Sequence, residues 1–150
     1  ISDTEMRREE VSYTIDTINR FRLKYSSSEL YLIMGYDNLL DLDLWKDSRE
    51  IMKNCHILVA SRPGLKAFHS TGKIFGLFNG DSPYRLGKIK NKTQEFIHRE
   101  TGKKLVVYDI SPRDISSSVV RERLVLGKSV DNLLPPEVET YIIEHQIYKI

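Results

Sequence analysis

The stretch LYLIMGYD, residues 30–37, decides the fold, because an apolar run from Leu30 to Met34 leads directly into a glycine and then an acidic residue. Apolar runs with few polar interruptions are typical of strands that are buried on both faces of a parallel sheet. Three further stretches have the same character: His56 to Ala60, Lys73 to Phe78 and Lys104 to Tyr108. We therefore expect four strands, although Gly76 falls inside the third run, where glycine weakens a strand.

Helices are expected before, between and after these runs. Their apolar positions recur at helical spacing in four groups: Ile15, Ile18 and Phe21; Ile51 and Met52; Val120 and Leu124; Val138, Tyr141 and Ile142. Residue types that begin or end helices mark their limits: Ser12 or Thr14, Asp47, Gly127 and Pro136. Strands that alternate with helices predict an α/β fold, in which helices flank an open parallel sheet.

The length of 150 residues predicts a single domain over residues 1–150 with one sizeable core. Residues 79–103 are rich in Gly, Asn, Lys and Asp. We expect this segment to be an excursion from the sheet that holds at most a short helix near Thr93 to Glu100.

Composition excludes several classes of protein. Lys and Arg number 23 and Asp and Glu number 21, so the net charge of +2 does not indicate binding to nucleic acid or to a membrane surface. The single cysteine, Cys55, suits a reducing compartment. The sequence shows neither a signal-peptide pattern nor a membrane-spanning run, so we expect a cytoplasmic protein. Its oligomeric state stays open, a homo-oligomer included.

Ligands of open parallel sheets bind beyond the carboxyl ends of the strands. Gly35 would let a ligand approach the backbone there, and Asp37 would accept hydrogen bonds from ribose hydroxyls, but both residue types are equally common in plain turns. Trp45, the only tryptophan, is expected either to stack on a flat aromatic ring or to pack half-buried. Arg62, which follows the second run, is compatible with a phosphate contact and with an exposed turn.

The strongest local signal is the run Ser116, Ser117 and Ser118, followed by Arg121. The start of a helix has free N–H groups and a positive dipole end, so it attracts phosphate. An arginine one turn later adds a charged fork. Simple capping by serine, with Arg121 as a surface charge, explains the same residues. None of the four histidines has another close by in the sequence, so we predict no protein-held metal.

Five motifs, in order along the chain, together resemble the bacterial nicotinate-nucleotide adenylyltransferases of the nucleotidyltransferase α/β-phosphodiesterase superfamily. The motifs are SYTIDT at 12–17, LIMGYDNL at 32–39 with Trp45 following, Cys55 to Gly64, ISSSVVR at 115–121, and LPPEV at 134–138 with Tyr141 and Ile142. The resemblance implies a Rossmann-like fold. It also implies a reaction in which nicotinate mononucleotide attacks ATP, giving nicotinate adenine dinucleotide and pyrophosphate, with Mg²⁺ bridging the phosphates.

The resemblance also implies roles for individual residues. Thr14 and Trp45 would hold the nicotinate ring, and Gly35 and Asp37 would meet the nucleotide's ribose and backbone. The ATP-binding residues would be Arg62, Ser116, Ser117, Ser118 and Arg121, of which Ser117 and Arg121 would be catalytic. Chemistry of this type depends on positioning and on neutralising charge rather than on a protein nucleophile.

Two departures from the family pattern stand out. Ser118 occupies a position where the family has threonine, which keeps the hydroxyl. The family's opening strand and its "GGSFxPxHxGH" loop have no counterpart in the printed sequence, so we expect the first strand and those two histidines to fall outside it. The activity of this chain alone therefore stays open. The alternatives are transfer to nicotinamide mononucleotide or another phosphate substrate, and a nucleotide-binding module without catalysis.

Overall fold

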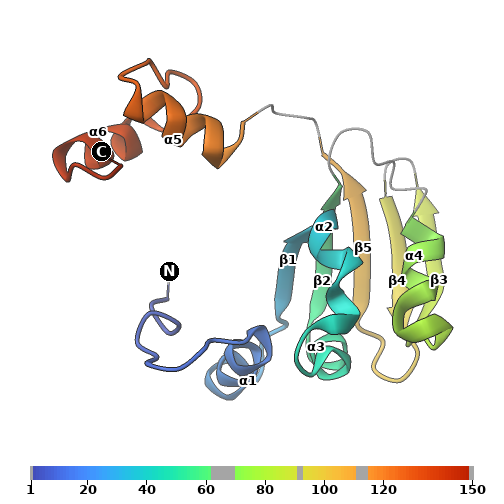
Figure 1. Ribbon diagram of the computed structural model, residues 1–150. Coiled ribbons are helices and arrows are strands. Elements are labelled where there is room, and N and C mark those ends of the chain that lie inside the picture. The colour runs from blue at the N-terminus through green and yellow to red at the C-terminus, as the bar shows by residue number, and fades with distance from the viewer. Residues whose placement is uncertain (1, 62–69, 91–92, 111–114, 149–150) are drawn as a thin grey trace. The chain divides into compact units, whose positions relative to one another are not determined.

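The computed structural model describes residues 2–61, 70–90, 93–110 and 115–148. These residues form two compact units, one within residues 1–111 and one within 112–150. The first unit holds the sheet, and the second holds two helices (Figure 1). Each unit is described by itself below.

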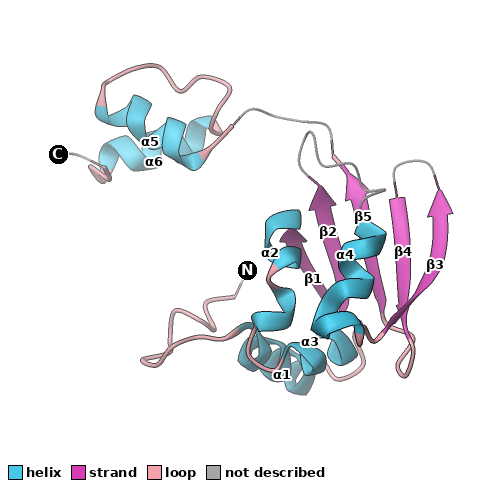
Figure 2. Cartoon of the chain, turned by 45° about the vertical axis from the view of Figure 1, so that its right-hand side comes forward, coloured by secondary structure: helices cyan, strands magenta, loops and turns pink. Residues whose placement is uncertain are grey.

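The first unit is built on a mixed sheet, which has five strands within the described residues (Figure 2). Their order is β1 (Tyr31–Gly35), β2 (His56–Ser61), β5 (Lys104–Asp109), β4 (Thr93–His98) and β3 (Tyr84–Lys90). The strands β1, β2 and β5 are parallel, while β4 pairs antiparallel with both β5 and β3. Three of the four predicted strands are therefore confirmed, at β1, β2 and β5.

Burial differs from the prediction at β1, which forms one edge of the described sheet. Its Tyr31 and Ile33 are 58% and 67% exposed, so this strand is buried on one face and not on both. Strand β2 alternates fully buried residues, Ile57 and Val59, with half-buried ones. An apolar run thus marks a strand without fixing how much of each face is covered.

Helices pack on the sheet to form the core. The helices of the first unit are α1 (Thr14–Lys24), α2 (Tyr36–Leu40), α3 (Ser48–Asn54) and α4 (Ser70–Gly76), with short 3₁₀ turns at Leu42–Leu44 and Leu77–Gly80. Helices α2 and α4 cover the same face of the sheet (Figures 1 and 2). Leu39 of α2 and Ile51 of α3 are fully buried in one apolar cluster with Ile57 of β2. The predicted helices at α1 and α3 are confirmed.

The predicted strand over Lys73 to Phe78 is wrong, because this segment forms α4 and the following 3₁₀ turn. Ile74 and Leu77, three residues apart, are both buried, which is the spacing of one helical face. A short apolar run fits a strand and a buried helix equally well, so its period alone misled the prediction.

The predicted excursion over residues 79–103 is also wrong, since β3 and β4 form an antiparallel hairpin that extends the sheet. Strand β4 alternates buried Gln94, Phe96 and His98 with more exposed residues. Two of these three inward residues are polar, so the strand lacks the apolar pattern that sequence reading requires.

The second unit contains α5 (Ser117–Val125) and α6 (Pro136–Glu144), both as predicted. Gly127 follows α5 with a φ of 62°, the left-handed conformation that a helix stop favours and that glycine adopts without strain. Pro136 is the first residue of α6, where its missing N–H costs nothing.

Candidate functional site

Thr14 and Trp45, the residues expected to hold an aromatic ring, line one cavity of about 280 Å³ in the first unit. Its full lining is Ser12, Tyr13, Thr14, Leu44, Trp45, Lys46 and Ile51. Thr14 opens α1 and Trp45 follows the 3₁₀ turn at Leu42–Leu44, so the fold brings two distant segments together. Trp45 is half-buried and packs against the core, and it also lines the cavity, so the two readings of this residue are compatible.

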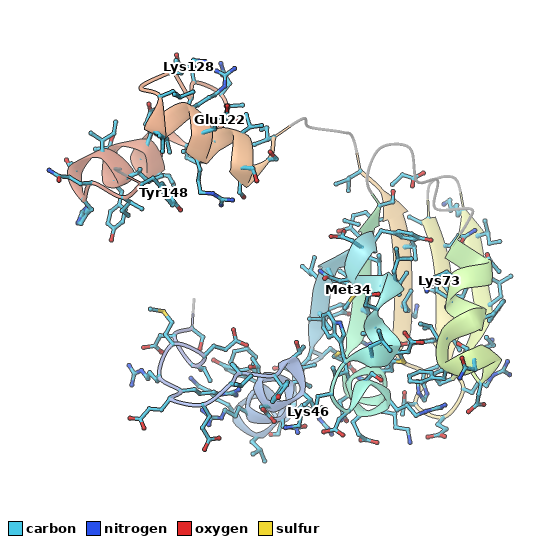
Figure 3. The ribbon with its side chains drawn as sticks, in the orientation of Figure 1. Met34, Lys46, Lys73, Glu122, Lys128 and Tyr148 are labelled. Carbon is cyan, nitrogen blue, oxygen red and sulfur yellow. The ribbon has the colours of Figure 1, made fainter. Side chains whose placement is uncertain are left out.

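The chemistry of this cavity suits a flat ring with a polar or anionic substituent. Trp45, Leu44 and Ile51 contribute apolar surface, and Ser12 and Thr14 contribute hydroxyl groups. The ammonium nitrogen of Lys46 lies 4.3 Å from the centre of the Tyr13 ring, a cation–π distance that holds a positive charge at the cavity. Figure 3 shows Lys46 beside the N-terminal segment and α1.

A second cavity, of about 710 Å³, adjoins the first because Lys46 lines both. Its lining is rich in charge: Arg7, Arg8, Glu9, Glu10, Val11, Asp16, Asn19, Arg20 and Lys46. The Arg8 side chain is only 8% exposed. Sequence reasoning missed Arg8, because a run of two arginines and two glutamates is usually a solvated surface.

Gly35 ends β1 and directly precedes α2. A Cβ added at Gly35 would lie 2.6 Å from Oδ1 of Asp37, so a side chain larger than hydrogen would displace that carboxylate. Asp37 is exposed in the first turn of α2. Glycine at this position therefore leaves room for the Asp37 carboxylate beside the strand end.

The carboxyl ends of the neighbouring strands carry a further polar pair. Ser61, at the end of β2, donates a 2.6 Å hydrogen bond to Oδ1 of Asp109, at the end of β5. Parallel strands bring their carboxyl ends to one edge of the sheet, which is why residues so distant in sequence meet. Arg62, the predicted ATP contact after β2, lies outside the described residues.

The predicted phosphate site belongs to the second unit, at the start of α5. Ser116 caps this helix, since its hydroxyl oxygen accepts a 3.2 Å hydrogen bond from the backbone N–H of Val119. Ser117, Ser118 and Arg121 are exposed, and Nη2 of Arg121 lies 3.5 Å from the Ser118 hydroxyl. Ser116 therefore caps the helix, as the capping interpretation expects, while the phosphate contact stays a prediction. The arginine and the serine also lie together at the positive end of the helix, where an anion would be attracted.

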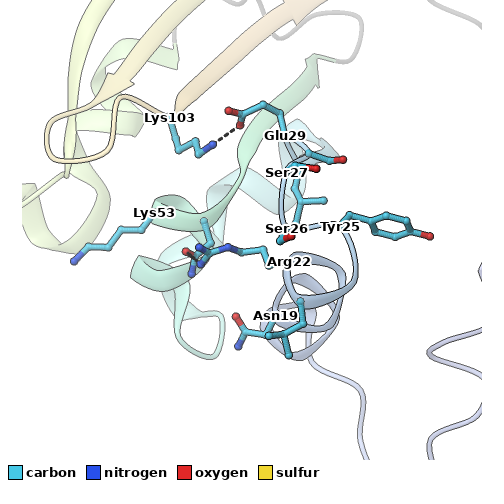
Figure 4. A pocket seen from close by; sticks show the side chains of 12 residues that line it. Asn19, Arg22, Tyr25, Ser26, Ser27, Glu29, Lys53 and Lys103 are labelled. Carbon is cyan, nitrogen blue, oxygen red and sulfur yellow. Dashed lines mark hydrogen bonds and ion pairs between the residues drawn. The ribbon is translucent and has the colours of Figure 1, made fainter.

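A third cavity, of about 610 Å³, lies at the opposite, amino ends of the parallel strands (Figure 4). Its charged groups are satisfied within the protein. Lys103 bonds to Glu29, whose pKa is lowered by this hydrogen bond and by the lysine charge. Lys53 forms a 3.0 Å ion pair with Glu100. Because these cations are already paired, this cavity is a weaker anion site than the start of α5.

Within the described residues, the chain shows neither a cluster of metal ligands nor a membrane-spanning helix. In the part of the chain that the structure describes, no three His, Cys, Asp or Glu side chains are grouped so as to hold a metal ion. Likewise, no described helix is long and apolar enough to cross a membrane.

Known proteins resemble the chain over most of its length. The cytidylyltransferase-like family model matches residues 2–123. A probable nicotinate-nucleotide adenylyltransferase of Pelobacter propionicus is 32% identical over 99% of the chain, and one of Geotalea daltonii is 36% identical over 99%. The chain spans 66% of the length of each of these relatives. They confirm the resemblance that the five motifs indicate.

A solved structure has the same fold. It is a Plasmodium falciparum nicotinic acid mononucleotide adenylyltransferase complexed with APC, with a TM-score of 0.60 and 16% sequence identity. The match covers 93% of this chain and 60% of that one. The predicted Rossmann-like class, an open sheet with flanking helices, is therefore confirmed, with the correction that an antiparallel hairpin completes the sheet.

Proposed function

The chain belongs to the cytidylyltransferase-like family, and from this premise we propose that it is a nicotinate-nucleotide adenylyltransferase of NAD biosynthesis. In the proposed reaction, ATP and nicotinate mononucleotide give nicotinate adenine dinucleotide and pyrophosphate. The observation that carries the proposal is the cavity that Thr14 and Trp45 line together, since it offers an aromatic face and hydroxyl groups to a pyridine ring. The names of the two bacterial relatives support the same activity.

In this proposal, the first unit binds the mononucleotide. The nicotinate ring stacks on Trp45, and the Thr14 hydroxyl bonds to its polar edge. Stacking of a base-like ring on an aromatic side chain is worth about 1–3 kcal/mol, enough to orient the ring. Asp37, in the first turn of α2, accepts hydrogen bonds from ribose hydroxyls, and Gly35 leaves room for the Asp37 carboxylate to do so.

The start of α5 takes the ATP phosphates in the same proposal. Ser116, Ser117 and Ser118 supply hydroxyl groups and free backbone N–H groups, and Arg121 supplies a charged fork. Ser117 and Arg121 are the proposed catalytic donors, because they neutralise charge that develops on the phosphates. Arg62 is a further proposed ATP contact.

The proposed step is an in-line displacement at phosphorus. An oxygen of the mononucleotide phosphate attacks the α-phosphorus of ATP. The bond from that phosphorus to the oxygen bridging to the β-phosphate breaks, and pyrophosphate leaves with the electron pair. Positioning and charge neutralisation supply the rate enhancement, so the protein needs no covalent nucleophile.

We propose that Mg²⁺ enters as the complex with ATP. Magnesium keeps several waters and is bound mainly through substrate phosphates in enzymes of this chemistry. The groups of the α5 start are serine hydroxyls and an arginine, all of which can bind phosphate oxygens. They fit a phosphate-held metal.

The single buried cysteine, Cys55, suits the reducing cytoplasm, where we propose that the reaction takes place.

The test is pyrophosphate release from ATP in the presence of nicotinate mononucleotide, with nicotinamide mononucleotide as the competing substrate. We expect turnover with the acid and a much lower rate with the amide. Preference for the amide would overturn the substrate assignment. ATP binding in calorimetry without any release would overturn the transfer reaction and favour a nucleotide-binding module.

A further inference from the structure

A tight turn between α4 and β3 places consecutive residues in the left-handed region of the backbone. Phe78 and Asn79 have φ/ψ values of 54°/42° and 57°/35°, and Gly80 has a φ of 92°. The backbone N–H of Asp81 donates a 3.2 Å hydrogen bond to the carbonyl oxygen of Phe78. A turn closed in this way, with about +60°/+30° at its second residue and a φ of about +90° at its third, is of type I′. Asn79 and Gly80 are its central residues, a pair that this turn type favours.

The two ends of this turn are held in place, whereas its middle is open. Cζ of Arg49 lies 4.1 Å from the centre of the Phe78 ring, and its Nη2 donates a 2.7 Å hydrogen bond to Oδ2 of Asp81. Asn79 and Gly80 are exposed, and a Cβ added at Gly80 would meet no described atom within 4 Å beyond its chain neighbours. The peptide plane between Asn79 and Gly80 therefore has room to rotate while the ends of the turn stay in place.

Rotation of that peptide plane converts the turn to type II′, which has about +60°/−120° at its second residue and a φ of about −80° at its third. Asn79 already has the required φ of 57°, and Gly80 reaches the negative φ without strain because it has no Cβ. At a ψ of about −120°, the backbone nitrogen of Gly80 is eclipsed with Cβ of Asn79. It then faces the side-chain amide carbon of Asn79 at short range.

We propose that Asn79 is a site of spontaneous deamidation in the folded protein. The backbone nitrogen of Gly80 bonds to Cγ of Asn79, and the Cγ–Nδ2 bond breaks. Ammonia leaves with the proton that the Gly80 nitrogen loses, and a cyclic succinimide remains. Water then adds to either ring carbonyl and opens the ring, which gives aspartate or isoaspartate. The net charge falls by one from +2, and the new carboxylate shares its turn with Asp81, which pairs with Arg49. This inference does not depend on the proposed function.

Asn132 provides a matched comparison within the same chain. It is also exposed and left-handed, with a φ of 62°, but Leu133 follows it. The backbone N–H of Leu133 donates a 2.9 Å hydrogen bond to the carbonyl oxygen of Val130, and its Cβ restricts the conformations that glycine reaches freely. The two asparagines therefore share exposure and backbone conformation, and they differ in the residue whose nitrogen must attack.

The experiment follows both asparagines by peptide mapping with mass spectrometry. The whole chain is incubated in mildly alkaline buffer, with circular dichroism to verify that it stays folded, and is then digested with trypsin. The digestion separates residues 74–85 from residues 129–149, because each segment follows a lysine and ends in a lysine or an arginine. We expect the first peptide to gain the mass of an amide-to-acid conversion, as two products of equal mass, at least about tenfold faster than the second. Asn79→Gln, which lengthens the side chain, should remove the change from the first peptide.

Deamidation of the folded chain at Asn79, with Asn132 intact, supports the assignment. An Asn79 that stays unmodified in the folded chain overturns it. The free peptide of residues 74–85 is the control for the conditions, because its deamidation beside an intact folded chain would show that the turn protects the amide. Equal rates at Asn79 and Asn132 also overturn the assignment, since neither Gly80 nor rotation of the central peptide would then determine the site.

Discussion

Replacing Trp45 by alanine should weaken the binding of nicotinate mononucleotide without unfolding the protein. Trp45 lines the 280 Å³ cavity and only part of it packs on the core, so its free ring surface is available for stacking. Losing a stacked ring costs about 1–3 kcal/mol, which corresponds to about a 5- to 150-fold rise in Kd. Trp45→Phe keeps an aromatic face and should give an intermediate value.

Isothermal titration calorimetry measures these affinities, because the variants lack the tryptophan that fluorescence would need. Urea denaturation should show a loss in unfolding free energy below about 3 kcal/mol for Trp45→Ala, less than for a fully buried aromatic residue. Leu23→Ala is the control, since Leu23 is 84% exposed on α1 and does not line the cavity. A folded Trp45→Ala protein with unchanged Kd would refute the stacking argument.

Three further predictions concern other parts of the chain. Arg121→Ala should weaken ATP binding roughly 10-fold or more in calorimetry, as for loss of a charged hydrogen bond; unchanged affinity would make Arg121 a surface charge only. Burial lowers the pKa of His98 from its ordinary 6.5, so the folded state takes up the proton less readily than the unfolded state. Unfolding free energy should therefore fall as the pH drops below that value, and His98→Asn should remove this dependence; a flat wild-type profile in urea denaturation contradicts it. Burial raises the pKa of Cys55 to about 11, so iodoacetamide at about pH 8 should label it only after unfolding, and rapid labelling of the native protein would show that the thiol is accessible.

The parallel part of the fold could be predicted because its signal is local. The strands β1, β2 and β5 are apolar runs, the pattern that predicts a buried strand, although a similar run at Lys73 to Phe78 forms a helix and a turn instead. The starts of helices α5 and α6 could also be predicted, from the serine that caps α5 and from Pro136 at the first position of α6. Gly127 follows α5 with a left-handed φ, which glycine adopts without strain, so the residue type alone predicted the end of the helix.

The hairpin of β3 and β4 could not be predicted because its buried positions are polar. Gln94 accepts a 3.4 Å hydrogen bond from the hydroxyl of Thr71, and Nδ1 of His98 accepts from the backbone N–H groups of Glu100 and Thr101. These partners satisfy part of the buried polar groups, whereas Nε2 of His98 has no partner among the described residues. The partners are known only once the chain has folded. Contacts with other parts of the fold therefore stabilise a strand that its own residue pattern did not predict.

The candidate site divides in the same way. The residue types at Thr14, Trp45 and Arg121 indicate from the sequence alone which ligand groups they could bind. The structure places Thr14 and Trp45 on one cavity. Arg8 could not be singled out from the sequence, because only the structure shows that its side chain is 8% exposed and that two of its nitrogen atoms are buried without a described partner. In a run of charged residues, the sequence does not show which side chain is buried in the folded protein.

A crystal structure of the chain with nicotinate mononucleotide is the most direct test of the central claim. The account predicts the pyridine ring stacked on Trp45 within the cavity that Thr14 lines. A nucleotide bound elsewhere in the first unit, or a cavity left without it at saturating concentration, would contradict the account.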